Sequence, residues 1–100
     1  MTIVFNNGGW NAPKRSTSLV HPKGTASRRD RYWITAGSNV RFADIAAAAG
    51  GAAAFRVTSY AELHGTLRDA LQVVRGGRSA VVDAVMVPIS EQVLGESLSN

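Results

Sequence analysis

The feature that most restricts the fold is an apolar run at residues 79–87, in which Asp83 is the one charged side chain. A strand that is apolar in both of its alternating sets of side chains must be covered on both faces, as in the parallel sheets of α/β proteins. Strand-like and helix-like segments alternate along the chain, which favours the same class. We therefore predict an α/β fold with a three-layer, parallel sheet and right-handed crossovers, in the order β, long loop, α, β, α, β.

Two further strands and a first helix are predicted from local patterns. Branched and aromatic residues favour a strand at residues 1–7. Bracketing glycines and the helix cap that follows favour another at residues 52–57. A helix over residues 39–49 would begin at Ser38 or Asn39 and end at a glycine pair. Its apolar face would consist of Phe42, Ile45, Ala46 and Ala49.

A second predicted helix has the clearest pattern in the chain. Ser59 is followed three residues later by Glu62, which is the spacing of a capping box. Its apolar stripe recurs at helical spacing and consists of Leu63, Leu67, Ala70, Leu71 and Val74. Residues 89–100 are predicted to form a polar C-terminal tail, helical around Glu91 to Leu94.

Residues 8–37 are punctuated by Pro and Gly, and we predict a long irregular loop there. Its basic part, residues 11–37, carries a charge of +5, so the remainder of the chain sums to −1. The cations are Lys14, Arg15, Lys23, Arg28, Arg29 and Arg31, opposed by Asp30. We favour a solvated connection for this loop; a flap over an anionic group and a nucleic-acid-binding surface that uses Trp10, Tyr32 and Trp33 are the alternatives.

Composition sets broad limits on the class of protein. The chain has 100 residues and no cysteine, which excludes a disulfide framework and a thiolate zinc site. It contains no apolar run of membrane-spanning length. We therefore expect a soluble, intracellular and cytoplasmic protein, with a mitochondrial location as the alternative for an intact parent protein.

The end of the first predicted strand has the residues of a metal-binding turn. Ile3-Val4-Phe5 leads into Asn6, Asn7, Gly8 and Gly9. The carboxyl ends of parallel strands are where ligands bind in open α/β sheets. Mg²⁺ prefers oxygen ligands, and Asn7 offers a side-chain oxygen while Gly9 offers an unobstructed carbonyl. A plain turn between strand and loop is the alternative, since Asn and Gly also favour turns.

The order of these motifs resembles the C-terminal half of the diphosphate-binding domain of thiamine-diphosphate-dependent enzymes. The branch it resembles contains acetolactate synthase, benzoylformate decarboxylase and pyruvate decarboxylase, which are transferases and lyases. The resemblance spans residues 3–88. The segments that carry it are Ile3 to Asn7, Phe42 to Gly50, Phe55 to Ser59, Glu62-Leu63 and Ala80 to Val85.

The resemblance implies a set of binding residues but no catalytic residue. In the family, the second Asn and the carbonyl two residues later hold Mg²⁺, which anchors the diphosphate. Carried over, Asn7 and Gly9 are the metal ligands, while Asn6 and Gly8 shape the turn. The Gly-Asp-Gly motif, which supplies a carboxylate to the metal, and the family's catalytic glutamate have no counterpart here.

The resemblance therefore predicts a partial cofactor-binding domain over residues 1–88, from an enzyme that acts with thiamine diphosphate and Mg²⁺ when intact. We expect missing N-terminal domains or a full-length homologue as partner, within the homodimers or tetramers typical of the family. Two alternatives remain at this point. One is a nucleic-acid-binding module, which we consider the weaker reading of the basic loop, and the other is a non-catalytic protein that pairs with a full-length homologue.

Overall fold

The computed structural model describes residues 1–32 and 39–87, and these belong to two compact units. The first unit, residues 1–7 and 39–86, is the α/β part of the chain. The second begins at Gly8 and contains two short helices. The predictions for the tail at 89–100, the cap at Ser38 and the aromatic Trp33 fall outside the described residues.

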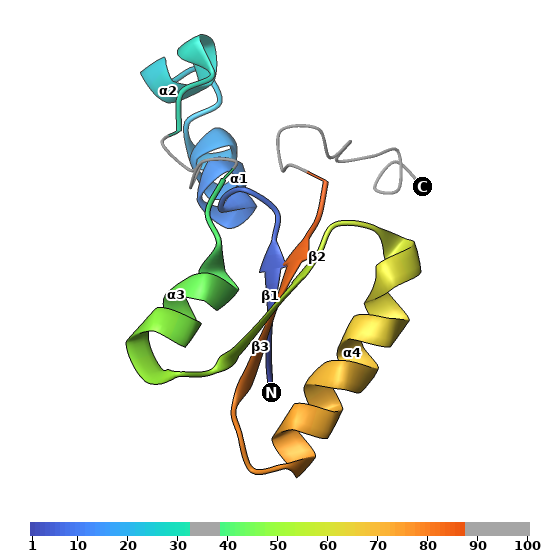
Figure 1. Ribbon diagram of the computed structural model, residues 1–100. Helices are drawn as coiled ribbons and strands as arrows, with labels where there is room; N and C mark the ends of the chain where they lie inside the picture. The colour runs from blue at the N-terminus through green and yellow to red at the C-terminus, as the bar shows by residue number, and fades with distance from the viewer. Residues whose placement is uncertain (33–38, 88–100) are drawn as a thin grey trace. The chain divides into compact units, whose positions relative to one another are not determined.

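The first unit is built on a parallel sheet of three strands, as predicted. They are β1 (Thr2–Asn6), β2 (Ala53–Val57) and β3 (Ala80–Val85), in the order β1-β3-β2. Two helices, α3 (Phe42–Gly50) and α4 (Tyr60–Arg75), lie on opposite sides of this sheet (Figure 1). The central strand β3 thus has a strand on each edge and a helix on each face, which explains its apolar sequence.

The main core lies between α4 and the sheet. Its buried residues are Val57, Ala70, Ala80 and Val82. The partly buried residues packed around them are Ala53, Phe55, Leu63, Leu67, Val73 and Val74. The predicted stripe of α4 was wrong at one position, because Leu71 is 43% exposed and Val73 packs on the core in its place. Helix α4 packs on β2 and β3, and Leu71 lies on a side of the helix that these two strands do not cover.

The predicted buried face of α3 was also partly wrong. Ile45 is 60% exposed and Ala49 is exposed, whereas Ala43 is buried. The small alanines at 43, 46 and 47 are buried or half-buried, whereas the bulkier Ile45 is exposed. The helix begins after Arg41 instead of Asn39, and Arg41 forms an ion pair with Asp44, which raises the pKa of its guanidinium.

The predicted capping box at the start of α4 is present. The Glu62 carboxylate accepts hydrogen bonds from the backbone N–H groups of Thr58 (3.2 Å) and Ser59 (3.3 Å). These two bonds, first that of Thr58 and then that of Ser59, lower the pKa of Glu62 below its ordinary value because they stabilise the ionised form.

This lowered pKa predicts a dependence of stability on pH. The ionised Glu62 stabilises the folded state above the pKa that it has in the unfolded chain, and the contribution is lost as the pH falls through its lower, folded-state pKa. We expect wild-type protein to exceed Glu62→Gln in stability at neutral pH, with the difference shrinking below about pH 4.5. Urea unfolding of both proteins between neutral and acidic pH measures this; a difference that stays constant with pH would contradict it.

The second unit contradicts the prediction of an irregular loop at 8–37. It contains α1 (Asn11–Val20) and α2 (Thr25–Arg29), which contact each other. Pro13 misled the prediction: it lies in the first turn of α1, where backbone N–H groups have no partner within the helix, so a proline is tolerated there. Pro22 and Gly24 fall between the two helices.

The basic residues of the second unit are thus carried largely by helices, and one of them is paired. Lys14 Nζ lies 3.1 Å from an Asp30 carboxylate oxygen and 5.2 Å from the centroid of the Tyr32 ring. The Tyr32 hydroxyl lies 2.9 Å from Ser18 Oγ. The Tyr32 ring therefore faces a cation of its own unit, which gives it a structural role and weakens the nucleic-acid reading. None of the helices in residues 1–32 and 39–87 is long and apolar enough to cross a bilayer.

Candidate functional site

The three strands end at the same edge of the sheet, and the chain leaves β1 there. Asn6 pairs with Val85, and Val57 pairs with Ala84. The Met86 N–H donates a 2.9 Å bond to the Asn6 carbonyl, which extends the ladder to the last residue of β1. Asn7 is consequently the first residue beyond the carboxyl edge of a parallel sheet, where α/β proteins bind ligands.

The side chain of Asn6 is fixed beneath this edge. It is buried, and its Nδ2 donates a 3.1 Å hydrogen bond to the backbone carbonyl of Val40. The same carbonyl accepts a 3.3 Å bond from Arg56 Nη1, and Arg56 Nη1 also lies 2.8 Å from Asp83 Oδ2. This group of four residues, which we call the Val40 network, joins the end of β1 to β2, to β3 and to the segment before α3.

Sequence reasoning did not predict the Val40 network, although it contains a visible signal. Asp83 stands alone in an apolar strand, and Arg56 is the one charged residue of β2. The register places both side by side on adjacent strands. Two lone opposite charges in neighbouring parallel strands predict a buried ion pair, provided that the strand order is known. The sequence alone does not contain that order.

Asn7, Gly8 and Gly9 form the turn itself. Asn7 is half-buried, and its backbone N–H donates to the Phe5 carbonyl at 3.1 Å. Gly8 has φ of +76°, and a Cβ placed there would meet no atom within 4 Å. Glycine is therefore required by the left-handed backbone and not by crowding. Asn7 ends the first unit, and Gly8 and Gly9 begin the second.

The donor set at this turn fits Mg²⁺ in kind. Asn7 offers a carboxamide oxygen and Gly9 a carbonyl, and covalent geometry keeps residues two apart within about 7 Å. Both are hard oxygen donors, which Mg²⁺ accepts alongside water and phosphate oxygens. Within residues 1–32 and 39–87, no three His, Cys, Asp or Glu side chains are grouped for a metal. Two protein oxygens leave most of an octahedral shell to be filled by other groups.

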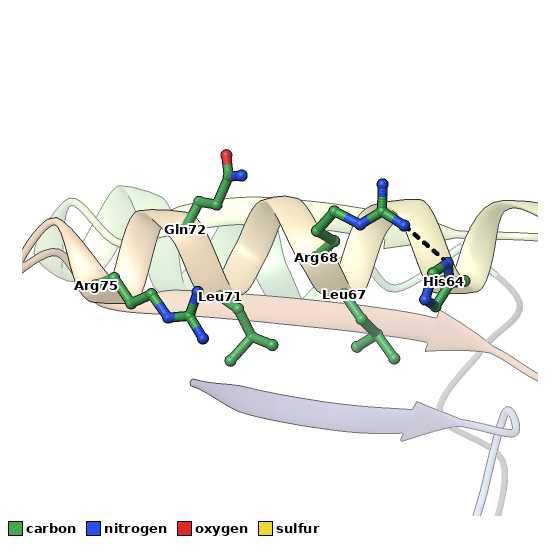
Figure 2. Close-up of a pocket in the computed structure, with 6 residues that line it drawn as sticks. All are labelled: His64, Leu67, Arg68, Leu71, Gln72 and Arg75. Carbon is green, nitrogen blue, oxygen red and sulfur yellow. Dashed lines mark hydrogen bonds between the residues drawn. The ribbon is translucent and has the colours of Figure 1, made fainter.

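A pocket of about 400 Å³ lies along α4 and does not include the turn at residues 6–9. It is lined by His64, Leu67, Arg68, Leu71, Gln72 and Arg75, all from α4 (Figure 2). Asn6, Asn7, Gly8 and Gly9 contribute nothing to it.

The three-stranded parallel sheet with a helix on each face defines an α/β domain. The chain matches, over residues 1–84, the sequence model of the family described as "Thiamine pyrophosphate enzyme, C-terminal TPP binding domain". It therefore belongs to the C-terminal thiamine-pyrophosphate-binding domains of thiamine pyrophosphate enzymes, as the sequence resemblance predicted. Neither the curated proteins nor the solved structures contain a significant match to this chain.

Proposed function

We propose that this chain binds the diphosphate end of thiamine diphosphate through Mg²⁺ held by Asn7 and Gly9. The Asn7 side-chain oxygen and the Gly9 carbonyl are the two ligands, and Asn6 and Gly8 set the geometry of the turn. The observation that carries the proposal is the position of Asn7 directly after β1, at the edge where all three parallel strands end. The family match over residues 1–84 supports the same cofactor.

The Val40 network gives this turn a fixed starting point. Because the Asn6 carboxamide is committed to the Val40 carbonyl, its side chain is held on the α3 face of the sheet. Gly8 follows with a positive φ, a backbone conformation that ends the extended strand. Asn6 is in this proposal a positioning residue, and Asn7 is the ligand. A ligand that follows a residue held by a hydrogen bond loses less freedom when a metal binds.

Thiamine diphosphate supplies the chemistry at the carbonyl carbon of a substrate, and the protein supplies binding and orientation. In the arrangement proposed here, residues 1–88 contribute one part of the cofactor-binding domain and residues 89–100 a C-terminal tail. The remaining metal ligands and the catalytic glutamate come from other polypeptide, either further domains or a full-length homologue. The intact enzyme is then an acetolactate synthase-like or decarboxylase-like lyase or transferase.

The metal ligands can be tested by replacing Asn7 and following Mn²⁺ as a paramagnetic substitute for Mg²⁺. With thiamine diphosphate present, substoichiometric Mn²⁺ should broaden the amide NMR signals of residues 7–9 first. Outer-shell changes alone alter metal affinity about 10- to 100-fold, so we expect Asn7→Ala to weaken Mn²⁺ binding at least tenfold. Asn7→Asp should keep the binding, because a carboxylate is also a hard oxygen ligand.

A matched control separates the loss of this ligand from the loss of any amide. Gln72→Ala removes a carboxamide from the exposed surface of α4, and Mn²⁺ affinity should not change. Circular dichroism of each variant verifies that the fold is retained. The proposal is wrong if Asn7→Ala binds Mn²⁺ as tightly as wild type, or if the broadening is centred outside the turn.

The same proposal predicts that the chain does not catalyse the family's reaction without a partner. Purified chain with thiamine diphosphate, Mg²⁺ and pyruvate should release no carbon dioxide above a protein-free blank. The physical reason is that the sequence offers no residue that matches the catalytic glutamate and no Gly-Asp-Gly carboxylate for the metal. Clear turnover, retained after repurification, would refute this part of the proposal while leaving the test of the metal ligands independent.

A further inference from the structure

The edge strand β1 carries apolar side chains on the same face of the sheet as α4, and they are exposed. Ile3 is paired with Val82 and Phe5 with Ala84, so these side chains lie on the side of the sheet that packs on α4. Yet Ile3 is 39% exposed and Phe5 71% exposed, because α4 packs on β2 and β3. Half of this face is therefore covered by a helix, and the β1 half is not.

One flank of α4 is hollowed, and the residues that line this hollow all come from the helix. The pocket of about 400 Å³ follows one stripe of α4 from His64 to Arg75, which spans about 16 Å, or three helical turns. Leu67 and Leu71 point from the helix toward the strands (Figure 2). Ile3 and Phe5 do not line this pocket but lie exposed on the same face of the sheet, and we call the stripe and these two side chains together the α4–β1 groove.

The charged side chains that line the groove are of one sign. Arg68 and Arg75 lie on it two turns apart, and no acidic residue lines it. Arg68 Nη2 lies 3.3 Å from His64 Nδ1 on the same helix, and this contact leaves its charge uncompensated. Leu71 lies between Arg68 and Arg75 along the stripe, and apolar side chains next to two cations favour an occupant with an apolar stripe and acidic flanks.

We propose that the α4–β1 groove binds an amphipathic helix whose apolar stripe is flanked by Asp or Glu side chains. A helix fits because this face of the sheet is already covered by one, and packed helices lie 8–10 Å apart, so a neighbour of α4 would cover Ile3 and Phe5. Apolar anchors at helical spacing are the usual way in which a helix is held in such a groove. The proposal does not depend on the metal site.

A second copy of the chain does not meet this requirement. In a two-fold symmetric dimer, each copy would present the same groove to the other. Arg68 and Arg75 of both copies would then be brought together, and like charges at an interface oppose association. The charge of the groove therefore selects an acidic helix over self-association.

The test uses two synthetic helical peptides of about 16 residues, long enough to span the groove. Both have leucines at helical spacing; one has glutamates beside them and the other has lysines in the same places. Titrated into the full chain and followed by NMR, the glutamate peptide should shift the signals of Leu67 and Leu71. The glutamate peptide can form surface ion pairs with the two arginines, where the lysine peptide would make two like-charge contacts. This difference corresponds to about tenfold in affinity, so the glutamate peptide should bind about tenfold more tightly than the lysine peptide.

Charge reversal provides the decisive variant. Arg68→Glu/Arg75→Glu should invert the preference, so that the lysine peptide binds more tightly. Arg28→Glu/Arg29→Glu, on exposed positions of α2, changes the net charge by the same amount and should leave the preference unchanged. Leu71→Ser should weaken both peptides, since it removes an apolar anchor that is not part of the core.

Four outcomes would overturn the proposal. If both peptides bind equally well, the charge of the groove does not select its occupant. If the peptides shift the signals of α1 and α2, they bind elsewhere on the chain. A concentration-dependent dimer in sedimentation that Leu71→Ser abolishes would assign the groove to a second copy. Absence of binding by either peptide, with the fold verified by the same spectra, would remove the groove as a site for a helix.

Discussion

Arg56→Ala should destabilise the α/β unit by about 3–5 kcal/mol, because it removes one partner of a buried ion pair. Asp83 is 1% exposed and lies in the central strand. Its Oδ2 accepts a 2.8 Å hydrogen bond from Arg56 Nη1. Its other oxygen, Oδ1, has no hydrogen-bond partner within the described residues. Without Arg56 the carboxylate would be left in the interior with no compensating charge. Urea unfolding followed by circular dichroism measures the loss.

Removing the other partner should cost less. The side chain of Arg56 is 23% exposed, so after Asp83→Ala its guanidinium keeps access to water and its bond to the Val40 carbonyl. The double variant Arg56→Leu/Asp83→Val should lie close to wild type, since apolar replacements of buried pairs are often neutral or stabilising. Equal costs for the two single variants, or a cost of Arg56→Ala below about 1 kcal/mol, would show that Asp83 is not held as described.

The same variant connects stability to the candidate site. The Val40 carbonyl accepts from both Arg56 and Asn6, so Arg56 helps to fix the carbonyl to which the last side chain of β1 is bonded. Apolar replacement of the pair keeps the fold but removes one of these two bonds. If the Val40 network positions the turn, the double variant should bind Mn²⁺ more weakly than wild type while unfolding at a similar urea concentration.

The strands and α4 were predictable from sequence because their patterns are local and strong. Residues 79–87 are apolar on both faces, and the Ser59–Glu62 box marks the start of α4 within one residue. Glycine at 51, with φ of +70°, ends α3 as glycine at that position predicts. The order of these elements then fixes a parallel sheet, since right-handed crossovers leave few arrangements.

The errors occurred where tertiary contacts override local pattern. The helical spacing of Ile45 and Leu71 is compatible with burial, but each helix covers only part of the sheet, so both side chains remain exposed. Helix α1 was missed because Pro13 was given the weight of a helix breaker, although a first-turn proline costs no hydrogen bond. The area of sheet that each helix covers depends on how the strands are arranged, which local pattern does not report. The place of Pro13 in the first turn depends on where α1 begins, and that start has no clear signal in the sequence.

The candidate site was predictable in part for the same reason. The identity of Asn7 and Gly9 as oxygen donors follows from residue type, and their place at the carboxyl edge follows from the strand that precedes them. The sequence does not show that Asn6 is held by a hydrogen bond while Asn7 follows the strand as the candidate ligand. Asn6 turns toward the Val40 carbonyl of a segment 34 residues later, and no local pattern reports a contact over that separation.

Ala70→Leu should destabilise the α/β unit by about 1–3 kcal/mol, which is the second largest effect expected here. Ala70 is fully buried on α4, in the cluster with Val57, Ala80 and Val82. Leucine and alanine differ little in helix propensity, so the cost would come from forcing extra methyl groups between α4 and the sheet.

The position of α4 on the sheet depends on this contact, because only a small side chain lets the helix approach closely enough to bury Val57 and Val82. Ala61→Leu is the matched control: it makes the same change on the same helix at an exposed position, and should alter stability by less than about 0.5 kcal/mol. In a domain of this size, each kcal/mol shifts the thermal midpoint by about 4–8 °C, so the two variants are separable by thermal unfolding. Equal midpoints for both would show that α4 does not pack on the sheet through Ala70.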